Sequence, residues 1–251
     1  MRFGREDADP IVILPGLSVQ HVTDSAEAVA AAYGKLAADY DIYLFDRRTD
    51  VPEEYTIRQM AEDTAQAMQM LELHHAGLFG VSQGGMIAQT LAARYPQLVS
   101  AMVLGSTACR ATAQTQDTVR FWIELAKEQK CQELMDAFAK AVYSPAFYEQ
   151  IQSILPAMAQ SIKPEELSRF IILASGLQGF DLSDQMGRIG CPVLVIGAGA
   201  DQIMGADSAP ELAEKLDCDL YIYEGYGHGV YDEAPDYVDR LKQFFDLYLK
   251  A

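Results

Sequence analysis

The stretch Ala76-Gly77-Leu78-Phe79-Gly80-Val81-Ser82-Gln83-Gly84-Gly85 carries the main signal for the fold. Its first six residues are apolar or small and predict a buried strand. Residues 83–94 predict a helix, because the segment ends just before Pro96. A serine therefore lies at a strand-to-helix turn, inside a G-x-S-x-G pattern.

The turn itself explains the glycines on either side of the serine. A Cβ atom two residues before or after Ser82 would clash in so tight a turn, and Gly80 and Gly84 meet that need. The turn places the Ser82 hydroxyl above the sheet edge, at the N-terminus of the next helix. Backbone N–H groups and the helix dipole favour a developing negative charge there, so we expect Ser82 to be a nucleophile.

Five more short apolar runs alternate with stretches of helical periodicity. They cover residues 11–14, 41–45, 99–104, 193–196 and 220–223. Short strands that are apolar on both faces and alternate with helices are typical of a parallel sheet covered on both sides. We therefore expect an α/β fold with a mostly parallel sheet and helices on both faces. The last helix is expected over residues 234–249.

Residues 110–188 interrupt this alternation, because they contain no convincing strand. Helices are expected over 118–130, 132–142 and 165–175, with Pro145, Pro156 and Pro164 as breakers. We interpret 110–188 as a helical cap insertion. The core is then formed by residues 1–109 and 189–251.

A serine at its ordinary pKa is a weak nucleophile, so Ser82 needs a base at the same sheet edge. His228 lies in a glycine-rich loop just beyond the last predicted strand, which places it at that edge. His74 and His75 lie at the opposite end of a strand about 20 Å long, and neither reaches the serine. His21 also lies on the Ser82 edge, and we consider it for ligand contact rather than as the base.

The acid that orients the base should also follow a strand. Asp201 does so, five residues after the run 193–196, and Asp207 is the lesser candidate. Asp46 follows the second strand, but Arg47 and Arg48 beside it indicate a structural ion pair.

The chain order Ser82, Asp201, His228 resembles that of the α/β-hydrolase superfamily, especially its small single-chain members with a helical cap. The resemblance covers nearly the whole chain. Its motifs are Ile11 to Gly16, the serine turn, Ala92-Ala93-Arg94-Tyr95-Pro96, Cys191 to Gly197, Asp201, Gly227-His228 and Glu233-Ala234-Pro235. The resemblance implies Ser82 as nucleophile, His228 as general base and Asp201 as its partner. It also implies an oxyanion hole formed by the backbone N–H groups of Leu17 and Gln83.

Three features depart from the family pattern. Pro15-Gly16 stands where relatives often have His-Gly, and residues 46–51 lack the glycines of the common D-x-R-G-x-G motif. Only about ten residues precede the first strand, where relatives usually carry a hairpin. One edge strand is therefore expected to be missing or vestigial, which favours a homodimer.

Substrate selectivity is expected to lie in the cap, which is rich in aromatic residues. The candidates for the substrate pocket are His21, Phe121, Trp122, Phe138 and Tyr143. The alternative is that the aromatic side chains form a small core within the cap. Arg120 and Arg169 are candidates to bind a substrate carboxylate, but solvated side chains are the simpler interpretation.

Composition excludes several classes of partner. The 251 residues carry a net charge of −17, and the only basic cluster, Arg47-Arg48, is flanked by acids. Neither nucleic acid nor an anionic membrane is an expected partner. No apolar run is long enough for a signal peptide or a membrane span. The four cysteines lie far apart, so we expect free thiols in a cytoplasmic protein, with no metal and no cofactor.

These observations predict a serine hydrolase that acts on a small, largely apolar molecule. The bond is an ester, thioester, lactone or C–C bond, since the same residues serve all four. The alternative is a small-ligand receptor or scaffold that retains the three residues without using them.

Overall fold

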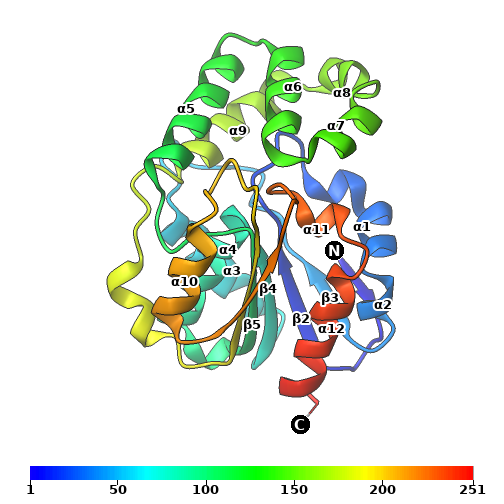
Figure 1. Ribbon diagram of the computed structural model, residues 1–251. Helices are drawn as coiled ribbons and strands as arrows, with labels where there is room; N and C mark the ends of the chain where they lie inside the picture. The colour runs from blue at the N-terminus through cyan, green and yellow to red at the C-terminus, as the bar shows by residue number, and fades with distance from the viewer. Residues whose placement is uncertain (251) are drawn as a thin grey trace.

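The computed structural model describes residues 1–250, in which seven strands form one sheet (Figure 1). The strand order is β1-β3-β2-β4-β5-β6-β7. The strands are β1 (Arg2–Gly4), β2 (Pro10–Leu14), β3 (Asp41–Leu44), β4 (Ala76–Val81), β5 (Val99–Gly105), β6 (Val193–Ala198) and β7 (Asp219–Tyr223). All neighbours are parallel except β1 and β3. The predicted α/β fold with a mostly parallel sheet is confirmed.

Helices cover both faces of the sheet, because the central strands alternate their side chains between two cores (Figure 1). On β2, Val12 and Leu14 enter one core, while Ile11 and Ile13 enter the other. The first core lies under α3 (Ile57–Met70), α4 (Gln83–Arg94) and α10 (Ser208–Leu216). The second lies under α1 (Ala26–Ala32), α2 (Gly34–Ala37) and α12 (Tyr237–Tyr248). Short 3-10 turns cover Val22–Ser25, Pro96–Leu98 and Ser183–Arg188.

The edge strand expected to be missing or vestigial is present as the three-residue β1. It pairs antiparallel with β3, where Arg2 lies opposite Tyr43 and Gly4 opposite Asp41. The Arg2 guanidinium also donates to both carboxylate oxygens of Asp41, at 2.8–3.1 Å. The edge of β3 is therefore paired within the chain.

Five helices between the two halves of the sheet gather at one end of the molecule (Figure 1). They are α5 (Ala113–Lys127), α6 (Cys131–Val142), α7 (Pro145–Ile151), α8 (Leu155–Ser161) and α9 (Pro164–Ser175). The sequence predicted only three of them, and treated the prolines as breakers. Pro145 and Pro164 are instead the first residues of their helices, where the missing N–H has no intrahelical partner.

The chain enters and leaves this helical segment at one place. Ala111 N donates to Phe180 O at 2.8 Å, and Leu182 N donates to Cys109 O at 2.9 Å. Between them, Arg110 and Asp181 form an isolated antiparallel bridge. We call residues 109–111 and 180–182 the stalk.

The last predicted helix is wrong at its start. The helix predicted over residues 234–249 is present as α12 (Tyr237–Tyr248), which begins three residues later than predicted, and the short α11 (Val230–Glu233) before it ends ahead of Pro235. Ala234 is extended, at φ −80° and ψ 121°, because the ring of the following proline disfavours the helical conformation.

The longest helix, α5, has 15 residues. Within residues 1–250, no helix combines the length and the apolar character that crossing a bilayer requires.

Candidate active site

Ser82 occupies the turn between β4 and α4 in a strained conformation, with φ 54° and ψ −121°. Hydrogen bonds on both sides fix it there. Its N–H donates to Gly105 O at 2.9 Å, and its carbonyl accepts from Thr107 Oγ1 at 2.7 Å. A non-glycine residue at positive φ persists only where its surroundings over-determine it. No pattern in the sequence points to Thr107, which lies 25 residues from Ser82 in the chain.

Gly80 and Gly84 are required by close contacts with different parts of the chain. A Cβ on Gly80 would lie 2.6 Å from Gly84 O, which is the clash expected within the turn. A Cβ on Gly84 would lie 1.9 Å from Leu14 O, at the end of β2. Gly84 therefore also lets the start of α4 approach the loop that carries Leu17.

His228 and Asp201 meet at the carboxyl edge of the sheet. His228 Nδ1 lies 2.8 Å from Asp201 Oδ2, and both residues are buried. The other carboxylate oxygen, Oδ1, accepts from Ile203 N at 2.8 Å and Met204 N at 2.9 Å. Burial opposes ionisation, but the nearby imidazole and these hydrogen bonds outweigh it and hold the pKa of Asp201 below its ordinary value.

The rival acid lies elsewhere. Asp207 is exposed at the start of α10, and within the described residues it makes no hydrogen bond to His228. His74 and His75 are exposed at the far end of β4.

The glycines around His228 allow the cap to approach its loop. Gly229 N donates to Val142 O at 2.6 Å, at the end of α6. A Cβ on Gly229 would lie 2.7 Å from the Tyr143 ring, and one on Gly227 would lie 3.1 Å from Val142 O. Tyr143 also donates to Asp232 at 3.0 Å. The helical segment and the His228 loop thus form one packed unit.

Ser82 and His228 line a common cavity of about 20 Å³, which α5 and α6 cover and which is lined mostly by apolar side chains. Its other lining residues are Gly16, Leu17, Val119, Trp122, Phe138, Val142, Leu177, Ile203, Met204 and Tyr231. The rings of Trp122 and Phe138 lie 4.5 Å apart between centroids, tilted by 36°, and both residues belong to this wall.

Three other residues expected in the pocket lie outside its lining. Phe121 is 51% exposed, because it faces away from the cap interior. Tyr143 packs on Gly229, and His21 Nδ1 lies 3.1 Å from Asp46 Oδ2.

Two backbone donors lie beside Ser82. A Cβ on Gly16 would lie 3.3 Å from Ser82 Cβ, so the loop after β2 runs directly against the serine. Within residues 1–250, neither Leu17 N–H nor Gln83 N–H donates to a backbone or side-chain acceptor. Both donors are therefore available to an oxygen near Ser82.

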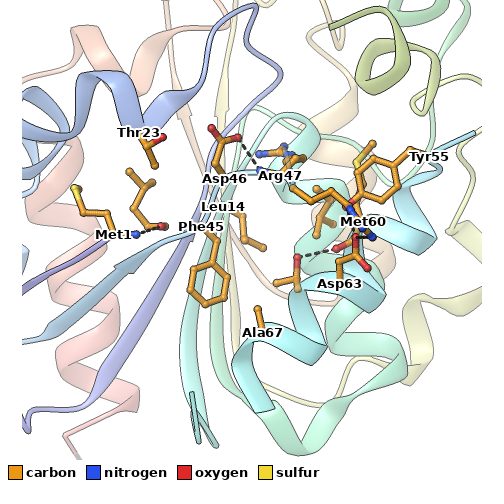
Figure 2. Close-up of a pocket in the computed structure, with 14 residues that line it drawn as sticks. Met1, Leu14, Thr23, Phe45, Asp46, Arg47, Tyr55, Met60, Asp63 and Ala67 are labelled. Carbon is orange, nitrogen blue, oxygen red and sulfur yellow. Dashed lines mark hydrogen bonds and ion pairs between the residues drawn. The ribbon is translucent and has the colours of Figure 1, made fainter. Parts of the chain in front are cut away.

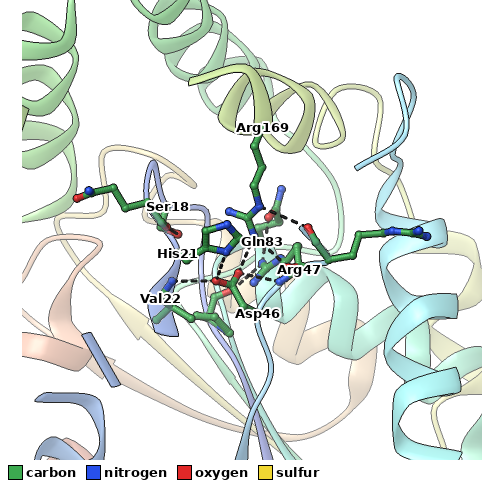
Figure 3. Close-up of polar contacts among 10 residues, drawn as sticks. Ser18, His21, Val22, Asp46, Arg47, Gln83 and Arg169 are labelled. Carbon is green, nitrogen blue, oxygen red and sulfur yellow. Dashed lines mark hydrogen bonds and ion pairs between the residues drawn. The ribbon is translucent and has the colours of Figure 1, made fainter. Parts of the chain in front are cut away.

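A buried polar network flanks this loop, centred on Asp46 (Figure 3). Asp46 Oδ1 accepts from Arg169 Nη2 at 2.8 Å, and Oδ2 accepts from Val22 N at 2.9 Å. The sequence predicted an ion pair between Asp46 and its neighbours Arg47 and Arg48. This prediction is wrong, because the Arg48 guanidinium pairs with Asp50 and Asp63 and that of Arg47 forms no salt bridge to Asp46 in the described residues. Arg169 is likewise not solvated: its side chain is 5% exposed.

The charges of this network favour an ionised carboxylate. Burial favours the neutral acid, but the guanidinium groups of Arg169 and Arg47 hold the pKa of Asp46 below its ordinary value. The ion pair with Arg169 joins α9 to the loop after β3.

A larger cavity, of about 310 Å³, lies between that loop and α3 (Figure 2). Asp46, Arg47, Tyr55, Met60 and Asp63 form part of its wall. Its lining includes neither Ser82 nor His228.

In the described part of the chain, no three His, Cys, Asp or Glu side chains are grouped to hold a metal ion. Cys109, Cys131, Cys191 and Cys218 are free thiols.

Comparisons with known proteins agree with this architecture. The family described as "alpha/beta hydrolase fold" matches residues 9–130. The "Putative carbamate hydrolase RutD" of Rhizobium rhizogenes is 26% identical over 84% of this chain and 82% of its own. The "Putative non-heme bromoperoxidase BpoC" of Mycobacterium tuberculosis is 29% identical over 97% of this chain and 95% of its own.

A solved structure gives the same answer for the fold. MGS-M2, an alpha/beta hydrolase enzyme from a deep-sea metagenome library of the Medee basin, superposes with a TM-score of 0.87. It is 23% identical, and the match covers 98% of this chain and 92% of that one. Fold and relatives together define the class of protein, a hydrolase built on the α/β-hydrolase fold. The chain has the α/β-hydrolase fold, and it is similar in sequence to members of the α/β-hydrolase superfamily.

Proposed function

We propose that this hydrolase is a serine hydrolase that cleaves an acyl bond of a small, uncharged and largely apolar substrate. The observation that carries the proposal is the constellation at the sheet edge. Ser82 and His228 line one cavity, and the 2.8 Å contact between His228 and Asp201 orients the imidazole.

The chemistry follows from which atoms are occupied. A carboxylate only accepts hydrogen bonds, so Asp201 requires the His228 proton on Nδ1 and leaves Nε2 free to accept the Ser82 proton. Ser82 Oγ then attacks the acyl carbon, and the carbonyl oxygen takes up negative charge beside the N–H groups of Leu17 and Gln83. His228 passes the proton to the leaving group, which departs and leaves an acyl-enzyme. Water deprotonated by His228 then releases the acid.

The cavity supports the substrate class. The lining contains no Lys, Arg, Asp or Glu side chain, so a substrate carboxylate would lose its hydration without gaining an ion-pair partner. A volume of about 20 Å³ favours a short acyl group, admitted by adjustment of the cap side chains. An ester is the first bond to test. The name of one relative, a carbamate hydrolase, adds carbamates to the set.

The experiment combines a covalent probe with a substrate series. A fluorophosphonate should add one phosphonyl group to wild type, located on Ser82 by peptide mass spectrometry, and none to Ser82→Ala. Ser82→Ala should lose hydrolysis by a factor on the order of 10³ to 10⁶ while remaining folded. Acetate and butyrate esters should react faster than matched esters that carry a carboxylate. A folded Ser82→Ala protein with wild-type turnover would refute the proposal. Ligand binding without labelling or turnover would favour a receptor.

A further inference from the structure

Arg47 is a buried cation without a carboxylate partner. It is 8% exposed, and in the described part of the chain it takes part in no ion pair. Its neighbour Asp46 accepts from Arg169 and from the backbone N–H of Arg47, but not from the Arg47 guanidinium. Burial lowers the pKa of Arg47 to about 10, so the group stays charged at neutral pH. The negative charge of Asp46 favours the ionised form of Arg47 and offsets part of the cost of burying it, but within residues 1–250 no carboxylate accepts a hydrogen bond from the Arg47 guanidinium.

One nitrogen of this guanidinium holds the two segments that carry the oxyanion donors. Arg47 Nη2 donates to Pro15 O at 2.6 Å and to Gln83 Oε1 at 3.0 Å (Figure 3). Pro15 lies two residues before Leu17, in the loop that runs against Ser82. The Gln83 amide is fixed at its other end, because Nε2 donates to Leu173 O of α9 at 2.7 Å.

We propose that Arg47 is a positioning residue that holds the N–H groups of Leu17 and Gln83 so that both point at the same substrate oxygen. This inference rests on the proposed serine hydrolase mechanism and adds a residue to it. The oxyanion hole is built from two segments that are 66 positions apart in the chain, and no backbone hydrogen bond joins Leu17 to Gln83. Arg47 supplies that link from a third segment, the loop after β3.

The charge adds to the geometry. A buried cation that touches both segments stabilises negative charge on the acyl oxygen more than it stabilises the neutral carbonyl. Such a residue affects the transition state more than the bound substrate, so its loss should lower kcat while leaving KM nearly unchanged.

We expect the fold to tolerate a substitution at Arg47, because one side of the residue faces a cavity. Arg47 forms part of the wall of the 310 Å³ cavity, so it is held by hydrogen bonds rather than by close packing on that side (Figure 2). A methionine at this position keeps the apolar stem and removes every donor.

The test compares Arg47→Met with a matched control, Arg94→Met. Arg94 lies at the opposite end of α4 and, like Arg47, has a buried Nε without a hydrogen-bond partner. The readouts are kcat and KM on p-nitrophenyl acetate, the rate constant for phosphonylation by a fluorophosphonate, and the affinity for a trifluoromethyl ketone. For Arg47→Met, kcat and the phosphonylation rate should fall about 10- to 100-fold, with KM within about threefold of wild type. Affinity for the ketone should fall by the same factor as kcat/KM. Arg94→Met should match wild type.

A second variant covers the case in which Arg47→Met does not fold. Gln83→Met keeps the backbone donor but removes the side-chain acceptor, and it should also lower kcat and the phosphonylation rate. In the double variant the losses should not multiply, because both changes break the same link. Wild-type kcat in folded Arg47→Met, or in Gln83→Met if that is the only folded variant, would overturn the inference. An equal loss in Arg94→Met would do the same. If Ser82→Ala itself keeps activity, the proposed function fails instead.

Discussion

At the scale of single residues, the choice of acid depends on hydrogen bonds that only the folded chain reveals. Both Asp201 and Asp207 follow β6, but Asp201 alone contacts His228 and accepts two backbone N–H groups. Asp207 is exposed. The loop between β6 and α10 therefore presents one carboxylate to the imidazole and the other to solvent.

Asparagine at these two positions should separate their roles. Asp201→Asn removes the charge that orients and stabilises His228, so kcat should fall by roughly 10⁴, the loss that this substitution causes in a Ser-His-Asp triad. Asp207→Asn should stay within about twofold of wild type, since no contact with His228 is lost. Steady-state kinetics on the same ester measure both. The opposite ranking would move the acid to position 207.

The pKa of Asp201 gives a prediction for stability against pH. Its folded-state pKa is lowered, so the ionised carboxylate stabilises the fold at pH values above the ordinary carboxyl pKa of about 3.9. This contribution is lost as pH falls through the folded-state pKa. The difference in unfolding free energy between wild type and Asp201→Asn should therefore shrink as pH falls below about 5. Urea unfolding followed by circular dichroism measures it. A constant difference over that range would contradict the assigned shift.

Sequence reasoning could place Ser82, Asp201 and His228 at one edge of the sheet, because each follows the carboxyl end of a strand. In a parallel sheet these carboxyl ends lie at the same edge. It could not find the partners of Asp46 and Gln83. Arg169 lies 123 residues from Asp46, and Leu173 lies 90 residues from Gln83, so tertiary packing alone brings them together. The prediction that Asp46 pairs with Arg47 and Arg48 was wrong for the same reason.

At the scale of elements, local sequence patterns predicted the helices of residues 110–188 least well. The helices α7 and α8 are seven residues each, too short to show a clear apolar period. Prolines that look like breakers in the sequence begin two of the helices. By contrast, the bounds of β4 and α4 agree with the prediction, because a buried strand, a glycine turn and a terminal proline mark them.

Trp122 on α5 should report what happens at Ser82. It is the only tryptophan, it is 3% exposed, and it lines the cavity that contains Ser82. A phosphonyl group on Ser82 has to displace or compress the wall of so small a cavity. We therefore expect a shift in tryptophan emission and in acrylamide quenching on full modification. Ser82→Ala mixed with the same reagent is the control. An unchanged spectrum after complete labelling would place the added group away from α5.

At the scale of the whole molecule, the cap and one face of the sheet share a core. A single cluster of buried side chains runs from Leu78 and Ile87 to Trp122, Leu134 and Phe170. Arg169 and Gln83 add polar links between α9 and the sheet edge. The cap is therefore expected to unfold together with the sheet.

Equilibrium unfolding tests this directly. Emission from Trp122 reports on α5 and its immediate surroundings, whereas far-ultraviolet circular dichroism reports on all helices and strands. The two transitions in urea should coincide in midpoint and slope. A fluorescence transition at lower urea would show that the cap opens as a separate unit. Arg94→Met, altered far from the cap, should shift both signals together.

The stalk has a consequence for how such a chain changes over generations. The residues before and after the helical segment are already hydrogen-bonded to each other, at 2.8 and 2.9 Å. Seen from the sheet, some seventy residues are a loop whose two ends meet, and the entropy of closing a loop grows only slowly with its length. Insertions or deletions beyond the stalk therefore leave the register of β5 and β6 untouched, as long as α6 and α9 keep their contacts with the sheet edge. The choice of substrate can therefore change through the helical segment, while the reacting atoms at the sheet edge keep their positions.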